Sequence, residues 1–163
     1  MALAPNKASE VRAELERAGA SFKTVEDLMR AIVHALNRTM LKYNWAGFYM
    51  LEAGSAPPGM LALGPFVGAM TPHTRIPLNQ GICGAAASSG KTVVVDDVSK
   101  DSRYLACSLE TKSEIVAPIF ANGKVVGELD IDSHFPAAFG IEDRALVEYC
   151  AALVGSYLEK HGA

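Results

Sequence analysis

EIVAPIFANGKVVGELDIDS, residues 114–133, is the stretch of sequence that decides the fold. Two apolar segments, EIVAPIF and VVGELDIDS, flank ANGK, in which Asn122 and Gly123 are the residue types that a two-residue type I′ turn requires. We therefore expect an antiparallel β-hairpin at this place in the chain.

The segments before this hairpin extend the same pattern. NWAGFYML (44–51) and MLALGPFVG (60–68) are strand-like and are separated by the turn sequence GSAPPG (54–59), so they predict another hairpin. Shorter strands are expected in TRIPLNQG (74–81) and KTVVVDDV (91–98), on either side of a helix of small residues. The chain thus contains about six predicted strands.

The strongest helical periodicity lies at the two ends of the chain. Apolar residues recur at helical spacing over 7–18, again after a capping box formed by Thr24 and Asp27, and once more from Glu142 to Tyr157. Strands in hairpins between terminal helices are typical of an α+β domain. We expect a central antiparallel sheet with the N- and C-terminal helices on one face.

The composition is that of one globular domain, with 50% hydrophobic and 20% charged residues in a chain of 163. A net charge of -3 without a Lys/Arg run argues against a nucleic-acid partner. The sequence shows no signal-peptide pattern and no membrane-spanning apolar run, and its three cysteines are an odd number. We therefore expect a cytoplasmic protein, with no membrane partner, whose thiols are free or redox-active.

Carboxylates gather on one face of the last strand. Alternation divides its side chains between two faces, with Val125, Gly127, Leu129 and Ile131 on one, and Val126, Glu128, Asp130 and Asp132 on the other. The partner strand of the hairpin brings Glu114 to the same neighbourhood as Asp130 and Asp132. On a solvated face these are only surface charges. Facing a cavity, they form a cation site in which one carboxyl stays protonated and acts as an acid.

Three aromatic residues lie in the segment 44–51. Trp45 and Tyr49 share one face of the predicted strand, and Phe48 lies on the other. All three residues are compatible with a place in the hydrophobic core. Trp45 and Tyr49 also have polar ends that suit a half-wet site, where a ring lies against a thioether or an ammonium group.

The cysteines differ in their surroundings. Cys150 lies on the apolar stripe of the last helix, so we expect it to be buried and inert. Cys83 follows a turn, where a helix N-terminus would lower a thiol pKa, but packing among alanines explains it equally well. Cys107 lies in the polar loop 96–112 and is the candidate nucleophile. A zinc site made of His73, Cys83 and Cys107 matches no established ligand spacing, so we expect no metal.

Taken in order, NWAGFYM, LALGPFVG, TRIPLNQGICGAAASSGKTVVVDDV, YLACS, SEIVAPI, GELDIDS and FGIEDRAL resemble a stand-alone GAF domain of the free methionine-(R)-sulfoxide reductase type. The resemblance runs from about Phe22 to Leu158. It implies a single GAF domain over residues 1–163, with an N-terminal helix at 6–19. It also implies a profilin-like sheet whose face away from the terminal helices carries a ligand pocket.

The resemblance further implies an activity, the reduction of free L-methionine-(R)-S-oxide to methionine without a cofactor. In the family a loop cysteine, here Cys107, attacks the sulfoxide as a thiolate, and a second thiol, here Cys83, converts the resulting sulfenic acid to a disulfide. A thioredoxin-like reductant completes the cycle. The residues that correspond to the substrate site are Glu114, Asp130, Asp132 and Trp45, with Tyr49 expected beside Trp45.

The chain departs from the family pattern at three positions. His73 stands where a further cysteine is usual, and Tyr104 and Ser108 replace two polar partners in the cysteine loop. The alternative function is therefore a non-catalytic GAF module that binds a small molecule as a sensor. The retained carboxylates, Trp45 and the absence of an output domain in this sequence favour the enzyme. Family resemblance and the wide apolar stripes of the terminal helices predict a homodimer.

Overall fold

The computed structural model describes residues 6–105 and 109–162, and its centre is a six-stranded antiparallel sheet of order β3-β2-β1-β6-β5-β4. The α+β fold class and the number of strands are as predicted. The strands are β1 Trp45–Leu51, β2 Met60–Val67, β3 Arg75–Pro77, β4 Val93–Val95, β5 Ser113–Ala121 and β6 Lys124–Ser133.

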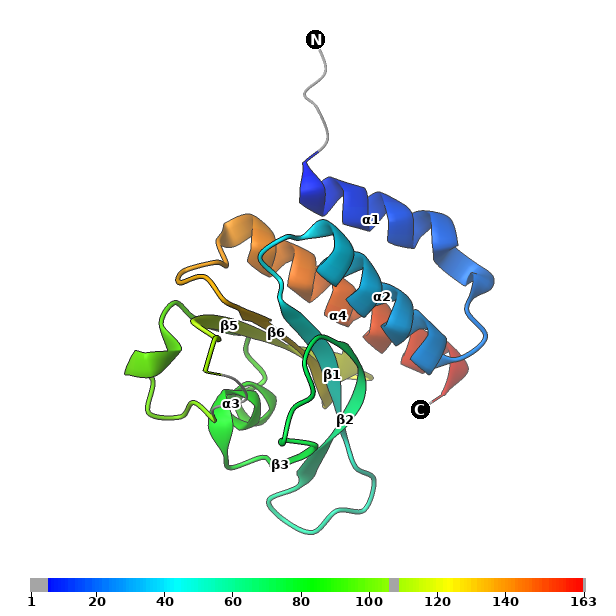
Figure 1. Cartoon of the computed structure of the whole chain (residues 1–163). Coiled ribbons are helices and arrows are strands. Elements are labelled where there is room, and N and C mark those ends of the chain that lie inside the picture. The colour runs from blue at the N-terminus through cyan, green and yellow to red at the C-terminus, as the bar shows by residue number, and fades with distance from the viewer. Residues whose placement is uncertain (1–5, 106–108, 163) are drawn as a thin grey trace.

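Helices cover both faces of this sheet (Figure 1). One face carries the terminal helices α1 Lys7–Ala18, α2 Val25–Thr39 and α4 Ile141–His161, and the other carries α3 Gly81–Ser89. Short 3-10 turns lie at Gly19–Ser21 and Val98–Lys100. No helix in the described part of the chain is both long enough and apolar enough to cross a membrane.

Local sequence signals account for the element boundaries. Asn122 and Gly123 have φ values of 52° and 77°, as a type I′ turn between β5 and β6 requires. The Thr24 side chain caps α2 by accepting a hydrogen bond from the Asp27 backbone N–H at 3.1 Å. The predicted turn and the predicted start of α2 at Thr24 are therefore confirmed.

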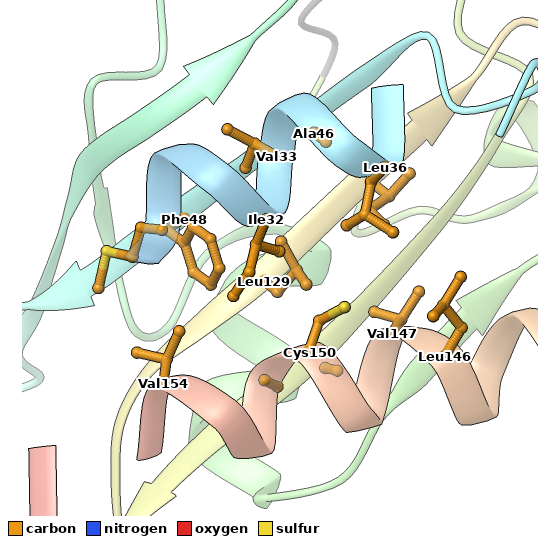
Figure 2. Packing of buried hydrophobic residues seen from close by; sticks show 14 of the residues in the cluster. Ile32, Val33, Leu36, Ala46, Phe48, Leu129, Leu146, Val147, Cys150 and Val154 are labelled. Carbon is orange, nitrogen blue, oxygen red and sulfur yellow. The ribbon is translucent and has the colours of Figure 1, made fainter. Parts of the chain in front are cut away.

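The main apolar core lies between the sheet and helices α2 and α4. Figure 2 shows Cys150 pointing from α4 into this core, toward α2, with Phe48 of β1 and Leu129 of β6 also within it. Cys150 is fully buried, as predicted, and its burial raises the pKa of its thiol to about 12. A thiol in this position stays protonated at neutral pH.

One part of the predicted strand alternation is wrong. From Glu128 to Asp132 the side chains alternate as expected, but Val126 packs on the α2 and α4 side and Val125 packs on the α3 side. The reason is an irregularity in the pairing of β5 with β6, where Ile119 pairs with Gly127 and the next residue, Phe120, pairs with Val125. This bulge reverses the two faces at the start of β6.

The apolar stripe of α1 is buried within the chain. Its residues Val11 and Leu15 belong to the main core, and α1 contacts both α2 and α4. This packing removes part of the reason for expecting a second copy against the terminal helices. Homodimer formation stays a prediction.

Helix α4 lies so close to β5 that Gly155 is required at the crossing. A Cβ at this position would lie 2.1 Å from the backbone oxygen of Phe120, which belongs to the sheet and cannot move independently. We expect Gly155→Ala to lower the free energy of unfolding by about 1–3 kcal/mol. Urea denaturation would measure it, with Ser156→Ala on the exposed side of α4 as the control. Equal midpoints for the two variants would contradict this packing.

Candidate functional site

The register of the three central strands brings the predicted carboxylates together. Glu114 of β5 is the pairing partner of Asp132 of β6, and Asp132 in turn pairs with Trp45 of β1. Asp130 pairs with Gly47, which has no side chain of its own, and the Trp45 indole lies over that glycine. The hairpin and the β1–β6 pairing therefore place three carboxyl groups side by side under α3.

These carboxyl groups are buried, which rules out their interpretation as surface charges. Glu114, Asp130 and Asp132 are at most 5% exposed, and Glu128, on the same face of β6, is completely buried. Both carboxyl oxygens of Glu128 and the Oδ1 atoms of Asp130 and Asp132 have no hydrogen-bond partner. Among the described residues, no lysine or arginine forms an ion pair with any of the four. Such groups require a proton or a bound cation.

Burial raises the pKa values of the carboxyl groups in this cluster by unequal amounts. It raises the pKa of Glu114 and Asp132 well above the ordinary value for carboxyl groups, and neighbouring Asp130 raises both further. Burial also raises the pKa of Asp130, but hydrogen bonds from Glu114, Asp132 and Cys83 oppose that shift. Within this cluster the pKa of Asp130 is therefore raised less than the pKa values of Glu114 and Asp132.

Cys83 reaches this cluster from the opposite side. It is the third residue of α3, and its Sγ donates a hydrogen bond to Asp130 Oδ2 at 3.6 Å. Of the two interpretations that the sequence left open, the structure favours the packed residue: burial, and then the neighbouring carboxyl groups of Asp130, Glu128 and Glu114, raise the pKa of the Cys83 thiol well above its ordinary value. These two effects outweigh the position near the helix N-terminus.

A small cavity lies between α3 and the cluster. Its lining includes Tyr49, His73, Cys83, Leu105, Glu114 and Asp130, and its volume is about 10 Å³. This volume is close to the lower limit for one water molecule. An amino-acid ligand would therefore have to displace some of the lining side chains. The predicted residue Tyr49 does line the cavity, and its hydroxyl donates to the backbone oxygen of His73 at 2.7 Å.

Trp45 does not line this cavity, but it contacts Tyr49, which does. Its indole stacks between Tyr49 and Phe66, with ring centroids 6.3 Å and 5.7 Å apart, and its Nε1 donates to the backbone oxygen of Ala69 at 3.0 Å. Glycine at position 47 leaves room for the ring, since a Cβ there would lie 2.4 Å from the indole. In this conformation Trp45 supports Tyr49, and direct contact with a ligand stays a prediction.

The predicted nucleophile, Cys107, and its neighbour Ser108 lie outside the described residues. Leu105, two positions before Cys107, is described and lines the cavity, and it lies against Gly81 at the start of α3. The loop therefore contacts the cavity at Leu105, two residues before Cys107 in the sequence.

Sequence reasoning did not single out Glu128 as a site residue. Its position on the carboxylate face of β6 was the available signal, because Asp130 and Asp132 follow it at the strand period of two. The structure adds it to the cluster as a fourth buried carboxyl group.

Comparisons with known proteins agree with this architecture. The model of the GAF domain family matches residues 24–158. A free methionine-R-sulfoxide reductase of Saccharomyces cerevisiae is 41% identical over 124 residues, covering 76% of this chain and 67% of that protein. The structure of such a reductase from Neisseria meningitidis, in complex with its substrate, has a TM-score of 0.86 at 30% identity and covers 100% of this chain and 98% of its own.

A type II free methionine-R-sulfoxide reductase from Thermoplasma acidophilum is also similar. Its structure is 38% identical, with a TM-score of 0.77, and the match covers 83% of this chain and 93% of that chain. The resemblance found in the sequence motifs is therefore confirmed at the level of both sequence and fold.

The raised carboxyl pKa values predict a protein that loses stability as pH rises. Below the ordinary Glu value of 4.5, Glu128 is protonated in the folded and unfolded states alike. Above it the unfolded chain releases a proton that the folded chain retains, so the free energy of unfolding falls. In Glu128→Gln this contribution is absent. We expect the stability of the variant relative to the wild type to increase with pH, by up to about 1.4 kcal/mol per pH unit.

Urea unfolding at about pH 5, 6.5 and 8 would measure this difference. Glu16→Gln, at an exposed position of α1, is the matched control and should differ from the wild type by a constant amount. Parallel pH profiles for Glu128→Gln and the wild type would show that Glu128 is not a buried, protonated group.

Proposed function

The chain belongs to the GAF domain family, and from this premise we propose that it reduces free L-methionine-(R)-S-oxide to methionine. The observation that carries the proposal is the buried cluster of Glu114, Asp130 and Asp132 beside a cysteine, without a cationic partner among the described residues. Similarity to reductases of free methionine sulfoxide, one of them with its substrate bound, supports the same reaction.

Buried carboxyl groups explain why the substrate would be a free amino acid. A free amino acid carries an ammonium group that can pair with Asp130 and neutralise its charge. A methionine sulfoxide within a polypeptide has an uncharged amide nitrogen at that position, so it would leave the carboxylate unpaired. A site built to bind a charged group discriminates strongly against an analogue that lacks it.

The proposed chemistry begins with the thiolate of Cys107. It attacks the sulfoxide sulfur, and the oxygen is transferred to Cys107 as methionine leaves, so that the thiol is oxidised to a sulfenic acid by two electrons. An acid must protonate the oxygen during this step. Glu114, whose raised pKa keeps it protonated, is the candidate within the cluster.

The proposed second step restores the enzyme. The Cys83 thiol attacks the sulfenic acid of Cys107, a disulfide forms and water leaves. Because the Cys83 thiol donates to Asp130, this carboxylate is placed to accept its proton. A thioredoxin-like dithiol then reduces the disulfide. A homodimer and a cytoplasmic location also belong to this proposal.

The first prediction of this proposal concerns turnover. Purified protein incubated with free L-methionine-(R)-S-oxide and dithiothreitol should release methionine, measured by chromatography, and the S epimer should react far more slowly. Cys107→Ser should lower the rate by at least about a thousandfold because serine cannot form a sulfenic acid. Cys150→Ala, which changes a thiol in the opposite core, is the matched control and should keep its activity.

Two outcomes would contradict the proposal in different ways. Unchanged turnover in Cys107→Ser would remove Cys107 as the nucleophile. Calorimetric binding of the sulfoxide by the wild type without any methionine formation would favour the sensor alternative.

The second prediction concerns the resolving thiol. One equivalent of substrate without reductant should give a Cys83–Cys107 disulfide, identified by mass spectrometry of tryptic peptides. Its rate of formation should increase with pH, because the raised pKa of Cys83 keeps most of the thiol protonated at neutral pH. Sulfenic acid trapped by dimedone at Cys107, with Cys83 still free, would instead show that an external thiol reduces Cys107 directly.

A further inference from the structure

We propose that Cys83, Glu114 and Asp130 form a binding site for a single zinc ion. The thiol of Cys83 and one carboxyl oxygen from each of Glu114 and Asp130 all lie within 4.8 Å of one another. All three residues are buried, and they come from α3, β5 and β6. The metal site does not depend on the proposed reductase activity, although the two share Glu114 and Asp130.

The separation of two of the ligand atoms fits a tetrahedral ion. Zinc binds thiolate sulfur at about 2.3 Å and carboxylate oxygen at about 2.1 Å, so a tetrahedral angle separates the two atoms by about 3.6 Å. The distance from Cys83 Sγ to Asp130 Oδ2 is 3.6 Å. Zinc could therefore replace the thiol proton between these atoms with little movement of either side chain.

A second observation is a set of buried carboxyl oxygens that a cation would satisfy. Asp130 Oδ1 and both carboxyl oxygens of Glu128 are buried without hydrogen-bond partners. Glu128 precedes Asp130 by two residues on the same face of β6, so it adds a further buried carboxyl group to this part of the cluster. A divalent ion would neutralise this excess of carboxylates, with Glu128 or a water molecule in the fourth position.

The mixed ligand set selects the type of metal. Magnesium and calcium prefer all-oxygen sites, whereas thiolate together with carboxylate suits zinc and its spectroscopic substitute Co²⁺. Sequence spacing gives no sign of this site, because the rest of α3, β4 and a loop separate Cys83 from Glu114, and most of a hairpin separates Glu114 from Asp130. The expectation of no metal rested on such spacing.

The site has a consequence that does rest on the proposed function. Zinc and the substrate ammonium group would compete for Glu114 and Asp130, and zinc would also hold the Cys83 sulfur that is proposed to resolve Cys107. Bound zinc would therefore exclude the substrate and protect the resolving thiol from oxidation.

Titration of the reduced, chelator-free protein with Co²⁺ would test the site directly. We expect one ion per chain, a thiolate-to-cobalt charge-transfer band, and loss of the band when Zn²⁺ displaces the cobalt. Cys83→Ser should abolish the band and weaken zinc binding by at least about a hundredfold in competition with a chromophoric chelator. Glu114→Gln should weaken binding but keep the band, which provides a second test if Cys83→Ser folds poorly.

Two cysteine variants serve as controls. Cys150→Ala and Cys107→Ser should both retain the charge-transfer band and the affinity for zinc. A band that survives in Cys83→Ser, or that disappears in Cys107→Ser, would overturn the site, as would the absence of any bound ion in the wild type. Zinc binding without reductase activity would overturn the proposed function alone, and reductase activity without zinc binding would overturn the site alone.

Discussion

Four carboxyl groups lie buried between the sheet and α3, and among the described residues none of them pairs with a lysine or arginine. Burying such groups destabilises the fold unless they are protonated or bind a cation. The apolar core on the opposite face of the sheet, between β6 and helices α2 and α4, supplies stabilising burial that offsets this cost. One face of the sheet thus carries the stabilising apolar core, and the other carries the carboxyl groups. Alternation of side chains along β6 directs successive residues to one face or the other.

The connection between the edge strands explains how a thiol joins this cluster. β3 and β4 lie at opposite edges of the sheet, so the chain between them must cross the sheet, and α3 makes this crossing on the carboxylate face. Gly84 lets the chain that leads into α3 pack closely against the helix, because a Cβ there would lie 2.8 Å from the backbone oxygen of Leu78. Cys83 is therefore held over Asp130 by the topology of the sheet.

Sequence reasoning predicted those features that depend on neighbouring residues. The Asn122-Gly123 turn and the Thr24 cap are examples, and the gathering of Glu114 and Asp130 followed from the hairpin. It failed where the outcome depends on distant partners. The faces of Val125 and Val126 depend on a bulge in pairing with β5. The raised pKa of Cys83 depends on burial by the folded chain and then on carboxyl groups more than 30 residues away in the sequence. Periodicity within one segment does not report either of these.

A proton, an ammonium group and a metal ion are three ways to satisfy the same buried charge, and they differ in what they require of Cys83. Protonation of the neighbouring carboxyl groups is compatible with the hydrogen bond that the Cys83 thiol donates to Asp130. An ammonium ligand would compete with that thiol for Asp130, and a metal ion would remove its proton altogether. The state of Asp130 therefore controls the state of Cys83. In the proposed reaction, substrate binding and the availability of Cys83 as the resolving thiol would be coupled through one carboxylate, without any need for a change in the surrounding sheet.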